Sequence, residues 1–96
     1  MSKTIYIKDL VNNKEYELNV EESLKISDIK GKIENIIGRR INNKLMIKKN
    51  HKNNSTSLND ENLTVKEAHI KNGDTIIVGK QQVQGGKILY KRNYSI

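Results

Sequence analysis

Hydrophobic and polar residues alternate in two runs within residues 3–20. In the segment KTIYIKDL, Ile5 and Ile7 fall on one side of an extended chain, and Tyr6 and Lys8 fall on the other. In EYELNV every second residue is apolar, namely Tyr16, Leu18 and Val20. Asn12-Asn13 between the runs suits a tight turn, because asparagine tolerates a positive φ. This pattern predicts a β-hairpin with one apolar face.

The segment ISDIKGKIENIIG has a different period. Its isoleucines recur at spacings of three and four, at positions Ile26, Ile29, Ile33 and then Ile36 or Ile37. Such a stripe predicts an amphipathic helix, and Gly38 is suited to end it. Gly31 inside the helix costs about 1 kcal/mol relative to alanine, so the helix depends on packing. Ser23 and Ser27 are both candidates for its N-cap.

The remaining residues predict two more strands and a polar loop. KLMI predicts a short strand through Leu45 and Ile47, and NHKNNSTSLNDEN is a turn-rich loop. LTVKEAHI predicts a helical turn that contributes three apolar residues, Leu63, Val65 and Ile70. Asn72-Gly73 predicts a turn before a last strand through Ile76 and Val78. One helix packed across one sheet gives an α+β roll.

Composition limits the classes of function. The chain has 96 residues, 34% of them hydrophobic, which is enough for one small core. It contains no cysteine, which excludes a disulfide framework, a zinc finger and a thiol nucleophile. His51 and His69 are isolated, so we expect no metal site, no cofactor and no enzymatic activity. No apolar run reaches the ~20 residues of a membrane span, so we expect a soluble domain. We also expect it to be a monomer in the cytoplasm.

The order of these elements resembles ubiquitin and its relatives. KTIYIKDL is similar to the first strand of that family, and LNVEESLKISDIKGKI is similar to its second strand and helix. KLMI resembles the third strand, and LTVKEAHIKNGDTIIV resembles the segment leading into the last strand. The resemblance covers about residues 3–86. It implies a ubiquitin-like β-grasp roll over residues 1–80, a mixed sheet with one main helix.

The same resemblance gives a meaning to Gly85-Gly86. In that family a terminal glycine carboxylate is adenylated with ATP and joined to target lysines, which implies an activating enzyme and a conjugating enzyme. Residues 81–86 would be the conjugation tail. Residues 87–96 would be an extension that a processing peptidase removes between Gly86 and Lys87. The tail reads QQVQ where the family typically has arginine and leucine.

The resemblance also implies surface residues. The aliphatic partner-binding patch of ubiquitin corresponds to Leu10, Met46 and Ile77, with Gly79 near the position of a valine. The lysines that would link chains are Lys8, Lys14, Lys30, Lys32 and Lys49.

A second function remains open at this point. An unconjugated ubiquitin-like domain could use its basic surface and its tail to bind RNA or a protein partner. The net charge of +7 favours such binding. However, Lys87, Lys91 and Arg92 supply three of these charges after the glycine pair, so nucleic acid is the less favoured partner.

Overall fold

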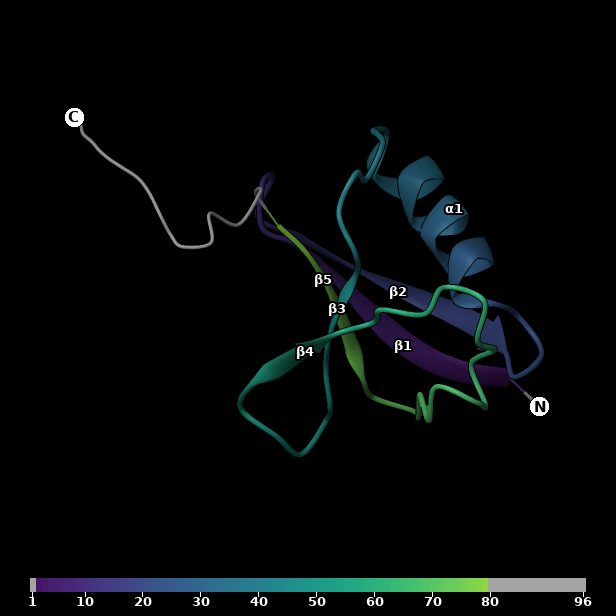
Figure 1. Cartoon of the computed structure of the whole chain (residues 1–96). Helices are drawn as coiled ribbons and strands as arrows, with labels where there is room; N and C mark the ends of the chain where they lie inside the picture. Colours follow the sequence, from purple (N-terminus) through teal and green to yellow (C-terminus); the bar gives the residue numbers. More distant parts are fainter. Residues whose placement is uncertain (1, 80–96) are drawn as a thin grey trace.

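The computed structural model describes residues 2–79, and it begins with the expected hairpin. β1 (Ser2–Asp9) pairs antiparallel with β2 (Lys14–Glu21), and Ile5 lies opposite Leu18. Asn13 has a φ of 56°, the left-handed conformation for which asparagine is suited. Figure 1 shows the two strands side by side. The hairpin prediction is therefore confirmed.

The helix α1 (Ile26–Ile37) also lies where the isoleucine period predicts it. Gly38 ends it with a φ of 78°, and its N–H donates to the carbonyl of Glu34 at 2.9 Å. The expected N-cap was wrong, because Lys25 occupies that position instead of Ser23 or Ser27. The carboxylate of Asp28 accepts the Lys25 N–H at 3.2 Å, which is the N3 half of a capping box.

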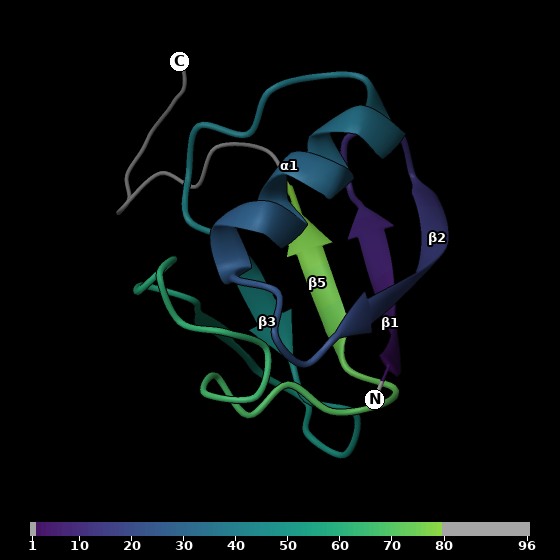
Figure 2. The same ribbon diagram turned by 90° about the vertical axis from the view of Figure 1, so that its right-hand side faces the viewer.

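Three short strands complete a five-stranded mixed sheet. β3 (Met46–Lys48), β4 (Ser55–Ser57) and β5 (Thr75–Val78) give the order β2-β1-β5-β3-β4. β1 and β5 are parallel, and the other neighbours are antiparallel. α1 lies across one face of the sheet (Figure 2). The architecture is the predicted α+β roll, with β4 as an additional strand inside the expected polar loop.

The core lies between α1 and the sheet and is aliphatic. Its fully buried members come from the helix, four strands and the connecting segments: Ile5, Ile7, Val20, Ile26, Ile29, Ile33, Leu45, Ile47, Val65, Ile70, Ile76 and Val78. Leu63 packs partly buried against them. Residues 64–70 form hydrogen-bonded turns, such as the 2.8 Å bond from the Ala68 N–H to the Thr64 carbonyl, without becoming a helix.

Asp9, at the end of β1, is a buried carboxylate that the sequence did not single out. Arg39 binds it with two hydrogen bonds of 2.8 and 3.0 Å, one to each oxygen. The N–H of Val11 and the side chain of Asn12 donate to the same carboxylate at 3.0 and 3.1 Å. The hydrogen bonds from Arg39 hold the pKa of Asp9 far below its usual range. The ion pair joins the β1–β2 turn to the chain that leaves α1.

A second buried carboxylate, Asp74, fixes the opposite end of the sheet. Lys49 donates to it at 2.6 Å, and the backbone N–H groups of Asn50 and Lys71 donate at 3.0 Å each. Burial opposes ionisation of Asp74, but these hydrogen bonds outweigh it and lower the pKa. Asp74 thereby connects the turn before β5 to the loop after β3.

Gly31 inside α1 and Gly38 at its C-cap differ in how they would tolerate a side chain. A Cβ on Gly31 would meet no atom within 4 Å, whereas Gly38 has a positive φ. We expect Gly31→Ala to raise the free energy of unfolding by about 1 kcal/mol. Gly38→Ala should lower it by about 1–2 kcal/mol, because the left-handed conformation strains alanine. Urea unfolding of both variants measures this, and a destabilised Gly31→Ala protein would contradict it.

The Asp9–Arg39 pair predicts a pH-dependent stability. We expect Arg39→Met to lower the thermal midpoint at pH 7 by roughly 10 °C, because it leaves the Asp9 charge buried and unpaired. Since folding lowers the pKa of Asp9, the pair stabilises the fold above the ordinary carboxyl pKa and loses this contribution at lower pH.

The difference between wild type and Arg39→Met should therefore shrink as the pH falls below about 4. Arg40→Met is the matched control, because Arg40 is exposed. Thermal unfolding followed by circular dichroism between pH 7 and pH 3 tests this. An equal effect of both variants would refute the role of the pair.

Candidate protein-binding face of the sheet

Strand alternation gives the sheet an inner face against α1 and an outer face away from it. Ile5, Ile7 and Asp9 of β1 are completely buried, so the residues between them point outward. We call the outer face of the three central strands the outer patch. Its apolar members are Tyr6, Leu10, Met46 and Ile77.

The three residues that the resemblance selected lie together in this outer patch. Met46 of β3 lies directly opposite Ile77 of β5 in the antiparallel register. Leu10 donates its N–H to the Val78 carbonyl at 2.8 Å, which fixes it beside the end of β5. A Cβ built on Gly79 would lie 3.2 Å from Leu10 Cδ1, so Leu10 covers the place where the family has a valine.

Tyr6 is a member of the outer patch that the resemblance did not select. It lies opposite Glu17 on one side and Thr75 on the other. Its exposed fraction is 41%, and that of Leu10 is 45%. The signal was present in the sequence, because the alternation in KTIYIKDL places Tyr6 opposite to the buried Ile5 and Ile7.

Charged residues of both signs border the outer patch. Lys8 lies between Glu15 of β2 and Ile77 of β5, and Lys48 lies opposite Thr75. An apolar centre with a mixed charged rim is the composition of a protein-binding surface. Phosphate-binding surfaces are instead uniformly basic.

Within residues 2–79 no group of three acidic or histidine side chains could hold a metal, and no helix is long and apolar enough to cross a membrane.

The five candidate chain-linkage lysines differ in exposure and in whether their amines form ion pairs. Three are exposed and have no ion-pair partner among residues 2–79, namely Lys8, Lys14 and Lys32. Lys30 forms a 3.1 Å ion pair with Glu61. Lys49 donates to both Asp74 and the His69 carbonyl. Its amine is therefore occupied, and its side chain is 27% exposed against 18% for Lys30, so these two are the least accessible acceptors of the five. Gly85, Gly86 and Lys87 lie outside the described residues.

Comparison with solved structures identifies similar folds. A ubiquitin-like domain from tubulin-binding cofactor B has a TM-score of 0.73 at 17% sequence identity, covering 91% of this chain and 96% of that one. The C-terminal ubiquitin-like domain of mouse tubulin-specific chaperone e has a TM-score of 0.66 at 16% identity, covering 88% and 92%. A ubiquitin-like domain of an Arabidopsis thaliana protein has a TM-score of 0.64 at 17% identity, covering 91% and 85%.

No protein-family model and no curated protein matches the chain. The three similar structures are described as domains, two of them belonging to proteins named for tubulin. At these identities the similarity concerns the fold. The chain therefore has a ubiquitin-like β-grasp fold.

Proposed function

We propose that the chain is a ubiquitin-like binding domain that recognises a protein partner through the outer patch. The observation that carries the proposal is the grouping of Leu10, Met46 and Ile77 on the sheet face that α1 leaves uncovered. Tyr6 extends the apolar area across the sheet, and exposed aromatic and methionine side chains are favoured at protein interfaces. The similarity to ubiquitin-like domains of the two tubulin-associated proteins supports a binding domain over a conjugated modifier.

The charge distribution favours protein over RNA as the partner. Residues 2–79 contain fourteen basic and eleven acidic side chains, which leaves a charge of +3. The remaining +4 of the chain comes from residues 80–96. Beside the outer patch, Glu15 and Glu17 of β2 lie opposite Lys8 and Tyr6 of β1, respectively. The two glutamates repel a phosphate backbone. The mixture of acidic and basic side chains is instead complementary to a protein surface that carries both signs of charge.

Site-specific photo-crosslinking tests the proposal in cells of the source organism. A benzophenone amino acid at Tyr6 or Met46 should give the same discrete crosslinked protein. The matched control is the same amino acid at Lys32, which is exposed on α1 and should not give that product. Ile77→Asp should abolish the product by placing a charge in the centre of the outer patch. A product that forms equally from Lys32, or that survives Ile77→Asp in a folded protein, would refute this proposal.

A second candidate function is a modifier precursor that is cleaved after Gly86 and conjugated through it. The position of Gly85-Gly86, seven residues beyond the end of β5 at Val78, favours it. The proposal requires the activating, conjugating and processing enzymes that the resemblance implies, with target lysines as acceptors.

Intact mass spectrometry of the protein from its source separates the two functions. A modifier is expected as a species that ends at Gly86, together with heavier adducts that disappear in a Gly86→Ala variant. A binding domain is expected to keep residues 87–96. Detection of only the chain that ends at Ile96, with no adducts, would exclude the modifier.

A further inference from the structure

The sheet has an open edge at β4, on the side away from β1 and β2. β4 is the last strand in the order, and all three of its residues are exposed. Within residues 2–79 its only neighbour in the sheet is β3, with Thr56 opposite Ile47 and Ser57 opposite Met46. An open edge carries unpaired backbone groups that can accept another strand.

The register determines which backbone groups of β4 point outward. The Leu58 N–H donates to the Leu45 carbonyl at 2.8 Å, and these residues continue the β3–β4 register. Directly opposed antiparallel pairs alternate between hydrogen-bonded and non-hydrogen-bonded pairs. Thr56 therefore bonds to β3, whereas the N–H and C=O groups of Ser55 and Ser57 face the open edge. Within residues 2–79 no backbone or side-chain group bonds to these four groups.

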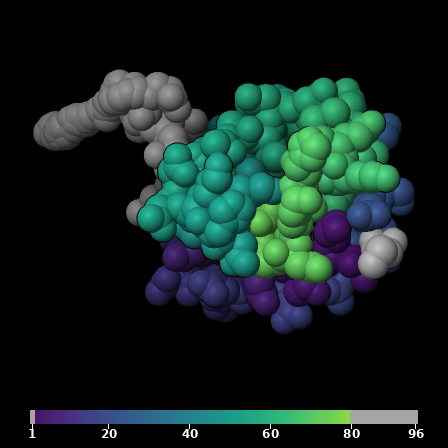
Figure 3. All heavy atoms as spheres, turned by 90° about the horizontal axis from the view of Figure 1, so that it is seen from below, coloured from purple at the N-terminus to yellow at the C-terminus, as the bar shows by residue number. Residues whose placement is uncertain are grey.

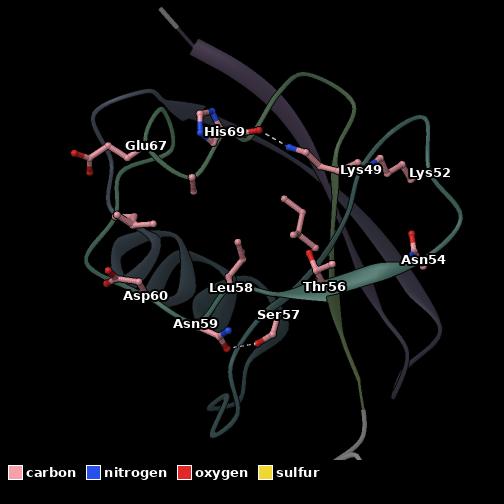
Figure 4. Close-up of a pocket in the computed structure, with 13 residues that line it drawn as sticks. Lys49, Lys52, Asn54, Thr56, Ser57, Leu58, Asn59, Asp60, Glu67 and His69 are labelled. Carbon is pink, nitrogen blue, oxygen red and sulfur yellow. Dashed lines mark hydrogen bonds between the residues drawn. The ribbon is translucent and has the colours of Figure 1, made fainter.

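A groove adjoins this edge on the inner side of the sheet. It has a volume of about 530 Å³ and lies between β4 and the segment 59–69. Its apolar lining consists of Ile47, Leu58, Leu63 and Ala68, and its charged lining has both signs, Lys49 and Lys52 with Asp60 and Glu67. In Figure 4, Leu58 and Thr56 lie at its centre, with Lys49 and Lys52 at one end. Figure 3 shows the teal-to-green residues of the β3–β4 hairpin beside the green segment that follows.

The β3–β4 hairpin has a single sign of charge. Residues 44–58 contain four lysines and no acidic residue: Lys44, Lys48, Lys49 and Lys52. Lys44 bonds to the Asn59 carbonyl and Lys49 to Asp74, so these two amines are occupied. Lys48 and Lys52 have no ion-pair partner among residues 2–79. Lys48 points to the outer face opposite Ser55, and Lys52 lines the groove.

We propose that the β4 edge binds an extended acidic peptide segment of a partner protein, which adds to the sheet as a sixth strand. The backbone groups of Ser55 and Ser57 pair with the peptide. Alternate peptide side chains enter the groove, where apolar residues fit the lining of Leu58, Leu63 and Ala68. The side chains between them lie on the outer face, where carboxylates meet Lys48. The open edge and the groove lie outside the outer patch, and the two surfaces adjoin at Met46 and Lys48.

The test uses a fluorescein-labelled seven-residue peptide of alternating glutamate and valine. Binding to the full chain is measured by fluorescence anisotropy, and the site is located by amide chemical shifts. We expect shifts concentrated in residues 45–58 and 63–69, with Tyr6 and Leu10 unaffected. A peptide with lysine in place of glutamate is expected not to bind. Equal binding of the lysine peptide, or shifts confined to the outer patch, would overturn the proposal and leave the outer patch to be tested by crosslinking.

Proline at Ser57 provides the sharpest variant. Ser57→Pro removes an N–H that faces the open edge and does not donate to β3. The fold should therefore persist, and the amide spectrum of the variant would verify this. We expect about tenfold weaker peptide binding, against no change for Ser57→Ala. Lys48→Gln should weaken binding about threefold and reduce its salt dependence, whereas Lys52→Gln, on the groove side, should have little effect.

A ten-nucleotide oligouridylate is the competing probe, because a basic hairpin also attracts phosphate. The proposal predicts that Ser57→Pro weakens peptide binding while any binding of the oligonucleotide is weaker than that of the peptide. If the oligonucleotide binds the hairpin more tightly than the peptide does, and Ser57→Pro leaves both affinities unchanged, strand addition is refuted.

Discussion

The structure depends on the burial of one helical stripe against one sheet face. Ile26, Ile29 and Ile33 of α1 are almost completely buried against the inner face of the sheet. Burying a side chain of this size contributes about 2–3 kcal/mol. Without this packing α1 would be unstable, since it is only twelve residues long and contains Gly31. Because the side chains of a strand alternate, covering the inner face also decides which residues are left on the outer face.

Two buried carboxylates then fix the ends of the sheet. Asp9 holds the β1–β2 turn and the chain after α1 through Arg39, and Asp74 holds the β3–β4 loop and the turn before β5 through Lys49. Each accepts backbone N–H groups as well as a cation, so the charge is satisfied at several points. These contacts position the two surfaces of interest. Asp9 precedes Leu10 of the outer patch, and Lys49 begins the loop that leads to β4.

The outer patch and the β4 edge are neighbours with different chemistry. Met46 belongs to the outer patch and lies opposite Ser57, whose backbone faces the open edge. The outer patch offers side chains with an apolar centre, whereas the edge offers backbone hydrogen bonds beside a basic hairpin. A strand added at β4 would extend the same sheet and would leave Tyr6 and Leu10 uncovered. The two surfaces could therefore bind two segments of one partner at the same time.

Where the chain's own periodicity was strong, the fold could be predicted from sequence. The isoleucine spacing predicted α1, and alternation predicted the β1–β2 hairpin and the outward position of Tyr6. The prediction of the N-cap was wrong because it relied on the preference for serine at that position. The helix instead begins after Lys25, whose N–H donates to the carboxylate of Asp28. β4 could not be predicted, since its three polar, exposed residues have no hydrophobic pattern, and only pairing with β3 makes them a strand.

The sequence by itself therefore determined the elements that bury apolar side chains and the face that each of them buries. The reason is that the spacing of apolar residues along a helix or strand places them on the one face that packs into the core. Only the tertiary structure decided what depends on long-range pairing. Arg39 meets Asp9 across thirty residues, Lys49 meets Asp74 across twenty-five, and β4 acquires an open edge from its place in the strand order. The physical reason is that an ion pair or a sheet edge is a relation between distant segments, and no local spacing encodes it.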